Sequence, residues 1–148
     1  MHTYTQILYQ IIFHTLNNEK TLIKEHREEL FFYIAKVIHN KNSNAYRIGG
    51  IEDHIHIITR IYPSIALSNL VKDIKLSSSY MIQKNMLFPN FRGWQHGFAA
   101  FTYSEKALPN LIEYVDNQEQ HHLSINTRDE IIGLLHENNV IFKERFLF

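Results

Sequence analysis

Two β-type runs separated by only two residues constrain the fold of this chain more than any other feature. The runs are Ala45–Ile51 and His54–Ile61, and Glu52-Asp53 lies between them. A connection this short joins antiparallel neighbours, because a parallel crossover needs a dozen or more residues. The sequence therefore predicts a β-hairpin at its centre, with Gly49-Gly50 marking a bulge or a close backbone approach.

Apolar patterning places the other elements on either side of this hairpin. Aromatic and β-branched runs predict strands, and apolar residues three and four positions apart predict amphipathic helices. The predicted elements are a strand at Tyr4–Thr15, helices at Glu25–His39 and from Ser64 through Ile82, a strand at Trp94–Tyr103, a helix from Leu108 to His121 and a last helix at Arg128–Asn138. Ser64 and Thr127 are the predicted N-caps of their helices.

This order of elements indicates the fold class. A β-α-β-β-α-β order is typical of an α+β, ferredoxin-like (RRM-like) sandwich, in which both crossover helices cover one face of an antiparallel sheet. The helix after the fourth strand and the final helix are additions to that unit. The added helix is the element expected to cover the free face of the sheet.

The composition indicates a compact protein and excludes several kinds of chemistry. The chain has 148 residues, 45% of them hydrophobic, with 5 Gly and 3 Pro, so one domain over residues 1–148 can bury a core. It has no cysteine, which excludes thiol catalysis and zinc–thiolate sites. No cationic segment precedes an apolar one at the N-terminus, and no apolar run approaches the roughly 20 residues that span a bilayer. We therefore expect a cytoplasmic protein without a membrane partner.

Charge is balanced overall but unevenly distributed. The chain has 15 basic and 15 acidic residues. Residues 60–106 hold six basic and two acidic residues, whereas residues 107–148 hold three basic and seven acidic ones. The basic middle part offers four candidate phosphate-binding residues, namely Lys72, Lys75, Lys84 and Arg92, with Tyr80 and Trp94 as candidate platforms for base stacking. A solvated helix and a core tryptophan explain the same pattern equally well.

Two histidines in the second run of the hairpin are candidate metal ligands. Side chains two residues apart in a strand point to the same face, so His54 and His56 stand together while Ile55 and Ile57 face the crossover helices. Two neutral imidazoles supply two ligands of a metal site that still needs an oxygen ligand. Two histidines on the polar face of a half-buried strand are the ordinary alternative.

The helix predicted after the fourth strand offers the missing oxygen and a nucleophile. Tyr114 and Gln118 are four residues apart and therefore share one helix face. With His54 and His56, Gln118 completes an N, N, O ligand set for a divalent metal, and Tyr114 lies one turn away. A phenol attacks phosphorus usefully when the phosphate is polarised and the phenolic proton has an acceptor.

Ordinary structural interpretations exist for each of these helix residues. Tyr114 could belong to the core, and Gln118 could be a solvated amide. His121 and His122 lie one turn beyond Gln118 and could bind phosphate or metal, but we interpret them as exposed residues at the helix end, where they favour the helix dipole. We interpret His96 as structural.

Taken together, these segments resemble a single-tyrosine HUH transposase of the insertion sequence 200/605 type, the IS200-like transposase domain. The segments that carry the resemblance are the first strand with its turn and Leu22, the His-hydrophobic-His motif Asp53–His56, the aromatic–glycine strand Trp94–Phe101 and the nucleophile helix Tyr114–His122. They follow in that order across nearly the whole chain.

The resemblance implies a DNA transposase that cleaves and rejoins single-stranded DNA through a covalent 5′-phosphotyrosine intermediate, leaving a free 3′-OH. By position, Tyr114 is the nucleophile, and His54, His56 and Gln118 hold Mg²⁺ or Mn²⁺. The implied DNA partner is a hairpin. The implied assembly is a homodimer in which the tyrosine helix of one subunit meets the histidines of the other.

The neutral charge departs from this family, whose members are usually basic. The segment Phe13–Glu19 lacks the Lys and Arg residues that we expect there, which predicts a shallower salt dependence of DNA binding. One alternative is therefore a domesticated, non-mobile hairpin-binding protein with little or no turnover. Another is a generic ferredoxin-like nucleic-acid or small-ligand module in which the histidines are incidental.

Overall fold

A four-stranded antiparallel sheet organises the chain, and the structure, a computed structural model, describes residues 2–147. The elements are β1 (Leu8–His14), α1 (Lys24–His39), β2 (Asn44–Gly50), β3 (His54–Arg60), α2 (Leu67–Asn85), β4 (Ala99–Tyr103), α3 (Leu108–Asp116), α4 (Gln118–His121) and α5 (Thr127–Glu137). The strand order is β2-β3-β1-β4. This is the predicted ferredoxin-like arrangement, and the predicted α+β fold class is confirmed.

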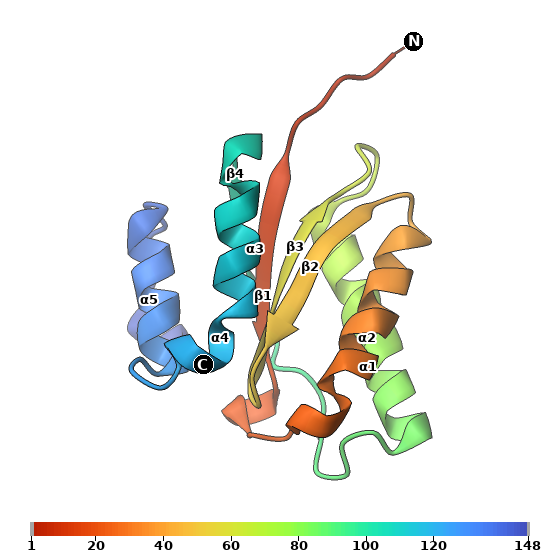
Figure 1. Ribbon diagram of the computed structural model, residues 1–148, viewed down its shortest axis with the longest axis vertical. Helices are drawn as coiled ribbons and strands as arrows, with labels where there is room; N and C mark the ends of the chain where they lie inside the picture. Colours follow the sequence, from red (N-terminus) through yellow and green to blue (C-terminus); the bar gives the residue numbers. More distant parts are fainter. Residues whose placement is uncertain (1, 148) are drawn as a thin grey trace.

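Each face of the sheet is covered by a different set of helices. Helices α1 and α2 pack on one face, and α3 and α5 lie on the other (Figure 1). Successive side chains of β3 point to opposite faces of the sheet. Ile55 and Ile57 belong to the main apolar core beneath α1 and α2, whereas His54 and His56 point to the face with α3 and α5. In the register of β1 and β3, Ile11 pairs with Ile57 and His14 pairs with His54.

The two faces differ in how their apolar residues are grouped. One continuous cluster fills the side of α1 and α2, and it contains Ile11, Phe13, Leu30, Ile34, Ile55, Ile57, Leu70 and Ile74. The other side has two smaller clusters. Leu8 and Ile58 pack with Leu111 and Val115 of α3. Ile12 and Phe101 pack with Ile131, Leu134 and Leu135 of α5.

The fourth strand is shorter than the sequence predicts. Strand β4 begins at Ala99 rather than at Trp94. Trp94 instead forms an isolated bridge with Thr15, and its indole N–H donates to Ser78 Oγ at 3.0 Å. Gly97, with φ of 87°, lies between the bridge and the strand. That left-handed conformation is incompatible with a continuous extended segment.

Both predicted N-caps are wrong by a few residues. Helix α2 begins at Leu67 with Ala66 at the N-cap position, so Ser64 precedes the helix without capping it. Asn126 caps α5, where its Oδ1 accepts a hydrogen bond from the N–H of Asp129 at 2.8 Å. Thr127 is therefore the first helical residue, and its hydroxyl is available for another partner.

The hairpin of β2 and β3 has its bulge and its close approach at different places. The register shifts between Ala45 and Arg47, so the bulge is not at Gly49-Gly50. Gly49 is the point of close approach, because a Cβ atom there would lie 2.7 Å from Val115 Cγ1 and 2.9 Å from the Val115 carbonyl oxygen. Because Gly49 has no side chain, α3 can pack closely against the sheet at this point.

Among residues 2–147, no helix combines the length and the apolar character needed to cross a membrane.

Candidate metal and nucleophile site

His54 and His56 lie side by side on β3, and both are fully buried. Their Nε2 atoms are 3.1 Å apart. The other ring nitrogen of each histidine is engaged, because His54 Nδ1 donates to Asp53 Oδ1 at 2.7 Å and His56 Nδ1 donates to Gln10 Oε1 at 2.9 Å. A neutral imidazole whose Nδ1–H is held in this way presents the lone pair of Nε2, which is the usual arrangement of a histidine that binds a metal.

Tyr114 and Gln118 meet this histidine pair, as the sequence predicts. Gln118 is 1% exposed, and its Oε1 lies 3.1 Å from His54 Nε2. The rings of Tyr114 and His56 are 5.6 Å apart and nearly perpendicular. The structure thus brings the four predicted site residues into one cluster.

The helix that carries Tyr114 and Gln118 is broken between them. The prediction of one continuous helix from Leu108 to His121 is wrong, since α3 ends at Asp116 and α4 begins at Gln118. Asn117, with φ of −96° and ψ of 16°, leaves the helical region but still donates its N–H to the Glu113 carbonyl at 3.0 Å. Because the break is mild, Gln118 stays on the same side as Tyr114.

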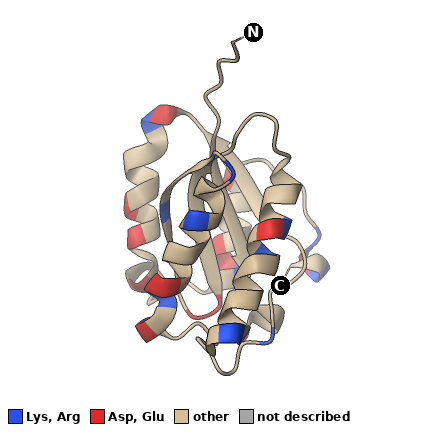
Figure 2. Cartoon of the chain, turned by 90° about the vertical axis from the view of Figure 1, so that its right-hand side faces the viewer, with Lys and Arg blue, Asp and Glu red and all other residues tan. Residues whose placement is uncertain are grey.

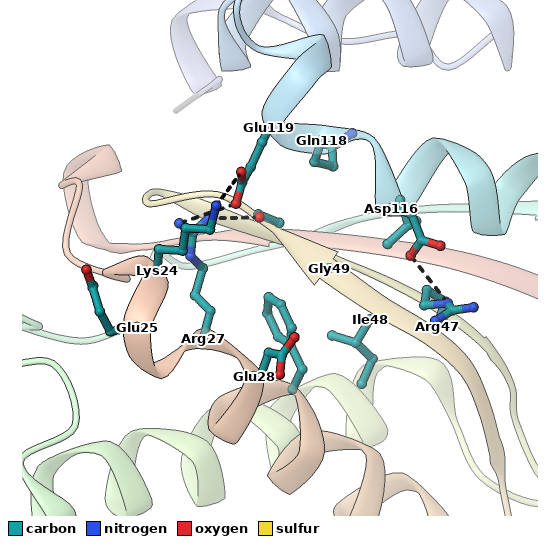
Figure 3. Close-up of a pocket in the computed structure, with 13 residues that line it drawn as sticks. Lys24, Glu25, Arg27, Glu28, Arg47, Ile48, Gly49, Asp116, Gln118 and Glu119 are labelled. Atoms are coloured by element: carbon teal, nitrogen blue, oxygen red, sulfur yellow. Dashed lines mark hydrogen bonds and ion pairs between the residues drawn. The ribbon is translucent and has the colours of Figure 1, made fainter.

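Ion pairs on the outer side fasten this junction to α1 and β2 (Figure 3). Lys24 Nζ lies 3.1 Å from Glu119 Oε2, and Arg47 Nε lies 3.4 Å from Asp116 Oδ1. Arg27 is 5% exposed and donates to the Gly50 carbonyl at 3.1 Å. The acidic side chains of Glu119 and Asp116 are therefore paired with cations of α1 and β2.

Two residues outside the predicted ligand set, Glu130 and His122, complete the cluster. Glu130 of α5 is 3% exposed, and its Oε1 lies 3.2 Å from His54 Nε2 and 3.3 Å from His56 Nε2. His122 follows α4, and its Nε2 lies 3.1 Å from Glu130 Oε1 and 3.1 Å from Gln118 Oε1. His122 Nδ1 donates to the Ile125 carbonyl at 2.8 Å.

The interpretation of His122 as an exposed helix-end residue is therefore wrong. Its side chain is 7% exposed, whereas that of the neighbouring His121 is 32% exposed. The sequence contained a signal for both His122 and Glu130. His122 is four residues beyond Gln118 and so shares its face, and Glu130 interrupts the apolar stripe of α5 that contains Ile131 and Leu134.

The pKa values show how strongly these buried groups are coupled. Burial would lower the pKa of His54, but hydrogen bonds to Asp53 and Glu130 outweigh burial and raise the pKa to about 9. Burial and the charge of His54 lower the pKa of His56 to about 4, despite the nearby Glu130. Burial and the charge of Glu130 raise the pKa of Tyr114 above its usual value. Without a metal, the site therefore holds His54 charged, His56 neutral and Tyr114 protonated.

The donor set fits a divalent metal ion. Ligand atoms of His54, His122 and Glu130 lie within 4.8 Å of one another, and His56 Nε2 and Gln118 Oε1 lie beside them. Three imidazole nitrogens, an amide oxygen and a carboxylate oxygen thus converge on one point. A metal ion held there would lie next to a tyrosine hydroxyl, which is an arrangement suited to phosphoryl transfer.

The four candidate phosphate-binding residues do not form one patch with this cluster. Lys75 donates to the Gln95 and Gly97 carbonyls at 2.7 and 2.5 Å, and Arg92 makes two hydrogen bonds to Glu19 at 2.9 and 2.8 Å. Lys72 and Lys84 lie on α2, on the opposite face of the sheet. Seen from the side of α1 and α2, basic and acidic residues are interspersed (Figure 2).

Comparisons with known proteins identify the fold and the family of the chain. The chain has the fold of a candidate transposase from Deinococcus radiodurans R1, with 19% identity, a TM-score of 0.62, and coverage of 80% of this chain and 95% of that one. It also has the fold of a REP-associated tyrosine transposase bound to a REP hairpin, with 16% identity, a TM-score of 0.60, and coverage of 82% and 72%. No curated protein matches the sequence. Residues 3–118 match the family described as "Transposase IS200 like", and the chain therefore belongs to the IS200-like transposase family.

Proposed function

We propose that this protein is a metal-dependent transposase that cleaves and rejoins single-stranded DNA through a phosphotyrosine at Tyr114. The observation that carries the proposal is the meeting of Tyr114 with His54, His56 and Gln118 in one buried cluster. Family membership supports the reaction class. We further propose that residues 1–148 act as one catalytic unit, because α5 supplies Glu130 to the same cluster.

The side chains of this chain account for orientation and charge in the reaction. Asp53 and Gln10 fix the ring orientation of the two histidines, and the ion pairs of Glu119 and Asp116 hold the helix junction in place. The Tyr114 oxygen attacks the scissile phosphorus, and the DNA 3′ oxygen departs. A divalent ion on the histidines and Gln118 would orient the phosphate and stabilise negative charge on its oxygens. The 5′-phosphotyrosine preserves the ester for later rejoining.

The ligand types favour one of the two expected metals. Mg²⁺ prefers an octahedral set of oxygen ligands, whereas imidazole nitrogens suit transition metals better. His54, His56 and His122 together present three such nitrogens. We therefore propose that Mn²⁺ binds more tightly than Mg²⁺.

The direct test is the formation of a covalent adduct. The wild-type protein is incubated with hairpin-bearing single-stranded DNA and Mn²⁺, and a protein–DNA species that survives denaturation is expected. Tyr114→Phe should form none, and a chelator should prevent adduct formation. An adduct of equal yield with Tyr114→Phe would refute the assignment of the nucleophile.

A DNA hairpin is the proposed partner, as in the REP-associated relative, which is bound to a hairpin. We propose Lys72, Lys75, Lys84 and Arg92 as candidate contacts to its phosphates. Each true phosphate contact adds about 0.9 to the slope of log affinity against log salt. The hairpin affinity of Lys72→Gln and of Lys84→Gln is measured at several salt concentrations, and each variant should reduce the slope by about that amount. If a variant leaves the slope unchanged, the substituted lysine does not contact a phosphate.

A second candidate function is hairpin binding without turnover. The balanced charge of 15 basic and 15 acidic residues and their interspersed arrangement on the helical side (Figure 2) favour it. Such a protein would bind the hairpin with the same affinity in the presence of a chelator, and its wild-type form would yield no adduct.

The homodimer implied by the resemblance is tested through the composition of the site. In this structure, Tyr114 and the histidines of a single chain are already in contact, so we propose that one chain can form the whole site. Tyr114→Phe and a double His54→Ala, His56→Ala variant are each expected to be inactive. A mixture of the two should remain inactive if the site lies within one chain, whereas recovery of adduct would show a site shared between subunits.

A further inference from the structure

Glu130 joins the two functional parts of the cluster through separate oxygen atoms. Its Oε1 faces three ring nitrogens, those of His54, His56 and His122, at 3.2, 3.3 and 3.1 Å. Its Oε2 accepts hydrogen bonds from the Tyr114 hydroxyl and, at 2.9 Å, from Gln118 Nε2. One carboxylate thus touches both the metal-binding nitrogens and the nucleophile.

The position of this carboxylate is fixed by the packing of α5. Ile131, Leu134 and Leu135 of α5 are buried against Ile12 and Phe101 of the sheet. Near the start of the helix, the Thr127 hydroxyl donates to Asp53 at 3.1 and 3.2 Å. Glu130 is 3% exposed, so the packing of α5 against the sheet fixes its side chain inside the protein.

The family match does not account for this residue. The match covers residues 3–118, and α5 begins at Thr127. Glu130 therefore lies outside the segment that matches the family, and its role has to be argued from its contacts alone.

The proposed reaction requires an acceptor for the proton of Tyr114. A tyrosine hydroxyl is a weak nucleophile until its proton is transferred, and a general base within hydrogen-bond reach performs that transfer. Glu130 Oε2 is the hydrogen-bond acceptor of the Tyr114 hydroxyl. His121 is a less suitable acceptor, because its ring centroid is 5.5 Å from that of Tyr114 and its Nε2 points to Glu130 Oε2 at 3.4 Å.

We infer that Glu130 is a catalytic residue, the general base that receives the hydroxyl proton of Tyr114 during strand cleavage. This inference rests on the proposed function. The bond from Tyr114 Oη to phosphorus forms while the bond from phosphorus to the DNA 3′ oxygen breaks, and the phenolic proton moves to Glu130 Oε2. The departing 3′ oxygen takes a proton from water, and the proton on Glu130 neutralises the hydroxide that remains. During rejoining, the bond from the DNA 3′ oxygen to phosphorus forms while the bond from phosphorus to Tyr114 Oη breaks. The attacking 3′-OH gives its proton through water to the Glu130 carboxylate, and the carboxylic acid formed in this way passes that proton to the departing Tyr114 oxygen.

The test separates proton transfer from metal binding and from folding. Glu130→Gln keeps the size and the hydrogen-bonding capacity of the side chain but cannot take the proton. Single-turnover adduct formation is measured for this variant and for the wild type at saturating Mn²⁺, with saturation established by calorimetry. We expect the rate to fall by about 100-fold to 10,000-fold, which is the usual contribution of general acid–base catalysis.

A more acidic tyrosine at position 114 provides the decisive comparison. Trifluorotyrosine, introduced at this position in place of Tyr114, loses its proton readily and needs less help from a base. We expect it to restore most of the adduct rate that Glu130→Gln loses, measured relative to the same trifluorotyrosine substitution in the protein with Glu130. If Glu130 only held the metal or supported the fold, the trifluorotyrosine would not restore the rate.

Each result supports or overturns the inference. A normal rate for Glu130→Gln, or a slow rate that trifluorotyrosine does not improve, overturns it while leaving the proposed function intact. The absence of any adduct with the wild type overturns the proposed function itself. If Glu130→Gln does not fold, Glu130→Asp takes its place, since it withdraws the carboxylate by one methylene; a smaller loss with the same recovery is then expected.

Discussion

The two faces of the sheet are built from the same strands but bury different kinds of side chain. On the face covered by α1 and α2, Phe13 and Ile57 belong to one continuous apolar cluster. On the other face, Gln10, His14, His54 and His56 are all buried, and the apolar residues there form two separate small clusters. Since strand residues alternate between faces, β1 and β3 build both surfaces at once.

The comparison of the two faces shows how the fold tolerates a buried cluster of polar side chains. Polar groups removed from water are costly unless they find hydrogen-bond partners. His56 has Gln10, His54 has Asp53, and Glu130 has several donors around it. The apolar face needs only complementary shape, whereas the polar face depends on specific partners, so changes to the two faces should have different effects.

The largest effect on stability is expected from a cavity on the apolar face. Phe13 is fully buried between the sheet and Trp94, with ring centroids 4.9 Å apart. Phe13→Ala should reduce the free energy of unfolding by about 3–5 kcal/mol, measured by chemical denaturation. Phe32→Ala on α1 is the matched control, because Phe32 is 70% exposed, and it should change stability by less than about 0.5 kcal/mol. Equal losses for both variants would contradict the assignment of this core.

A substitution at the contact of α3 with the sheet should affect both stability and the site. Gly49→Ala places a Cβ atom 2.7 Å from Val115 Cγ1, so α3 must shift. The free energy of unfolding should fall by about 1–3 kcal/mol, and adduct formation by Tyr114 should slow. Gly133→Ala on α5 is the control, since nothing lies within 4 Å of its Cβ position. It should stabilise the helix by about 0.5–1 kcal/mol. A neutral Gly49→Ala would show that the approach of α3 is not constrained there.

A change behind the histidine pair should weaken metal binding more than folding. Asp53→Asn replaces the carboxylate that holds His54 Nδ1 at 2.7 Å, and the affinity for Mn²⁺ should fall by about 10-fold to 100-fold, measured by calorimetry. Thr127→Val removes the hydroxyl that also bonds Asp53 and should leave metal affinity nearly unchanged. If Thr127→Val weakens binding as much as Asp53→Asn, the carboxylate does not act through His54.

The pKa of His54 predicts how pH affects the metal-free and metal-bound protein. The folded-state pKa of about 9 lies above the usual histidine value of 6.5, so the stability that His54 contributes is fully present below pH 6.5 and is lost as pH rises through 9. A metal needs the neutral ring, so Mn²⁺ affinity should rise about tenfold per pH unit over this window. Calorimetry in two buffers with different ionisation enthalpies should show the release of about one proton per ion. A pH-independent affinity would contradict a charged His54.

The sequence predicted the apolar face almost completely and the polar face in part. Strand alternation placed His54 and His56 correctly because period two allows no other arrangement once Ile55 and Ile57 are buried. Helical spacing placed Tyr114 and Gln118 together because residues four apart share a face. Both are local rules, and they hold whatever the rest of the chain does.

The contribution of α5 could not be derived from such rules. Its docking depends on the turn and bend of residues 122–125 and on packing against Ile12 and Phe101, which are far away in sequence. Glu130 on the apolar stripe was the visible sign that this helix covers something polar, but the stripe alone does not say what. Similarly, the short β4 follows from the backbone conformation of Gly97, which a pattern of aromatic residues does not reveal.

Locating the covalent bond between protein and DNA tests the role of Tyr114 most directly. After reaction with hairpin-bearing single-stranded DNA and Mn²⁺, the adduct is digested with nuclease and protease and analysed by mass spectrometry. We expect a 5′-phosphonucleotide on the peptide that contains Tyr114, and none when EDTA is present. A nucleotide on another of the 8 tyrosines, or an adduct that forms equally well with EDTA, would contradict it.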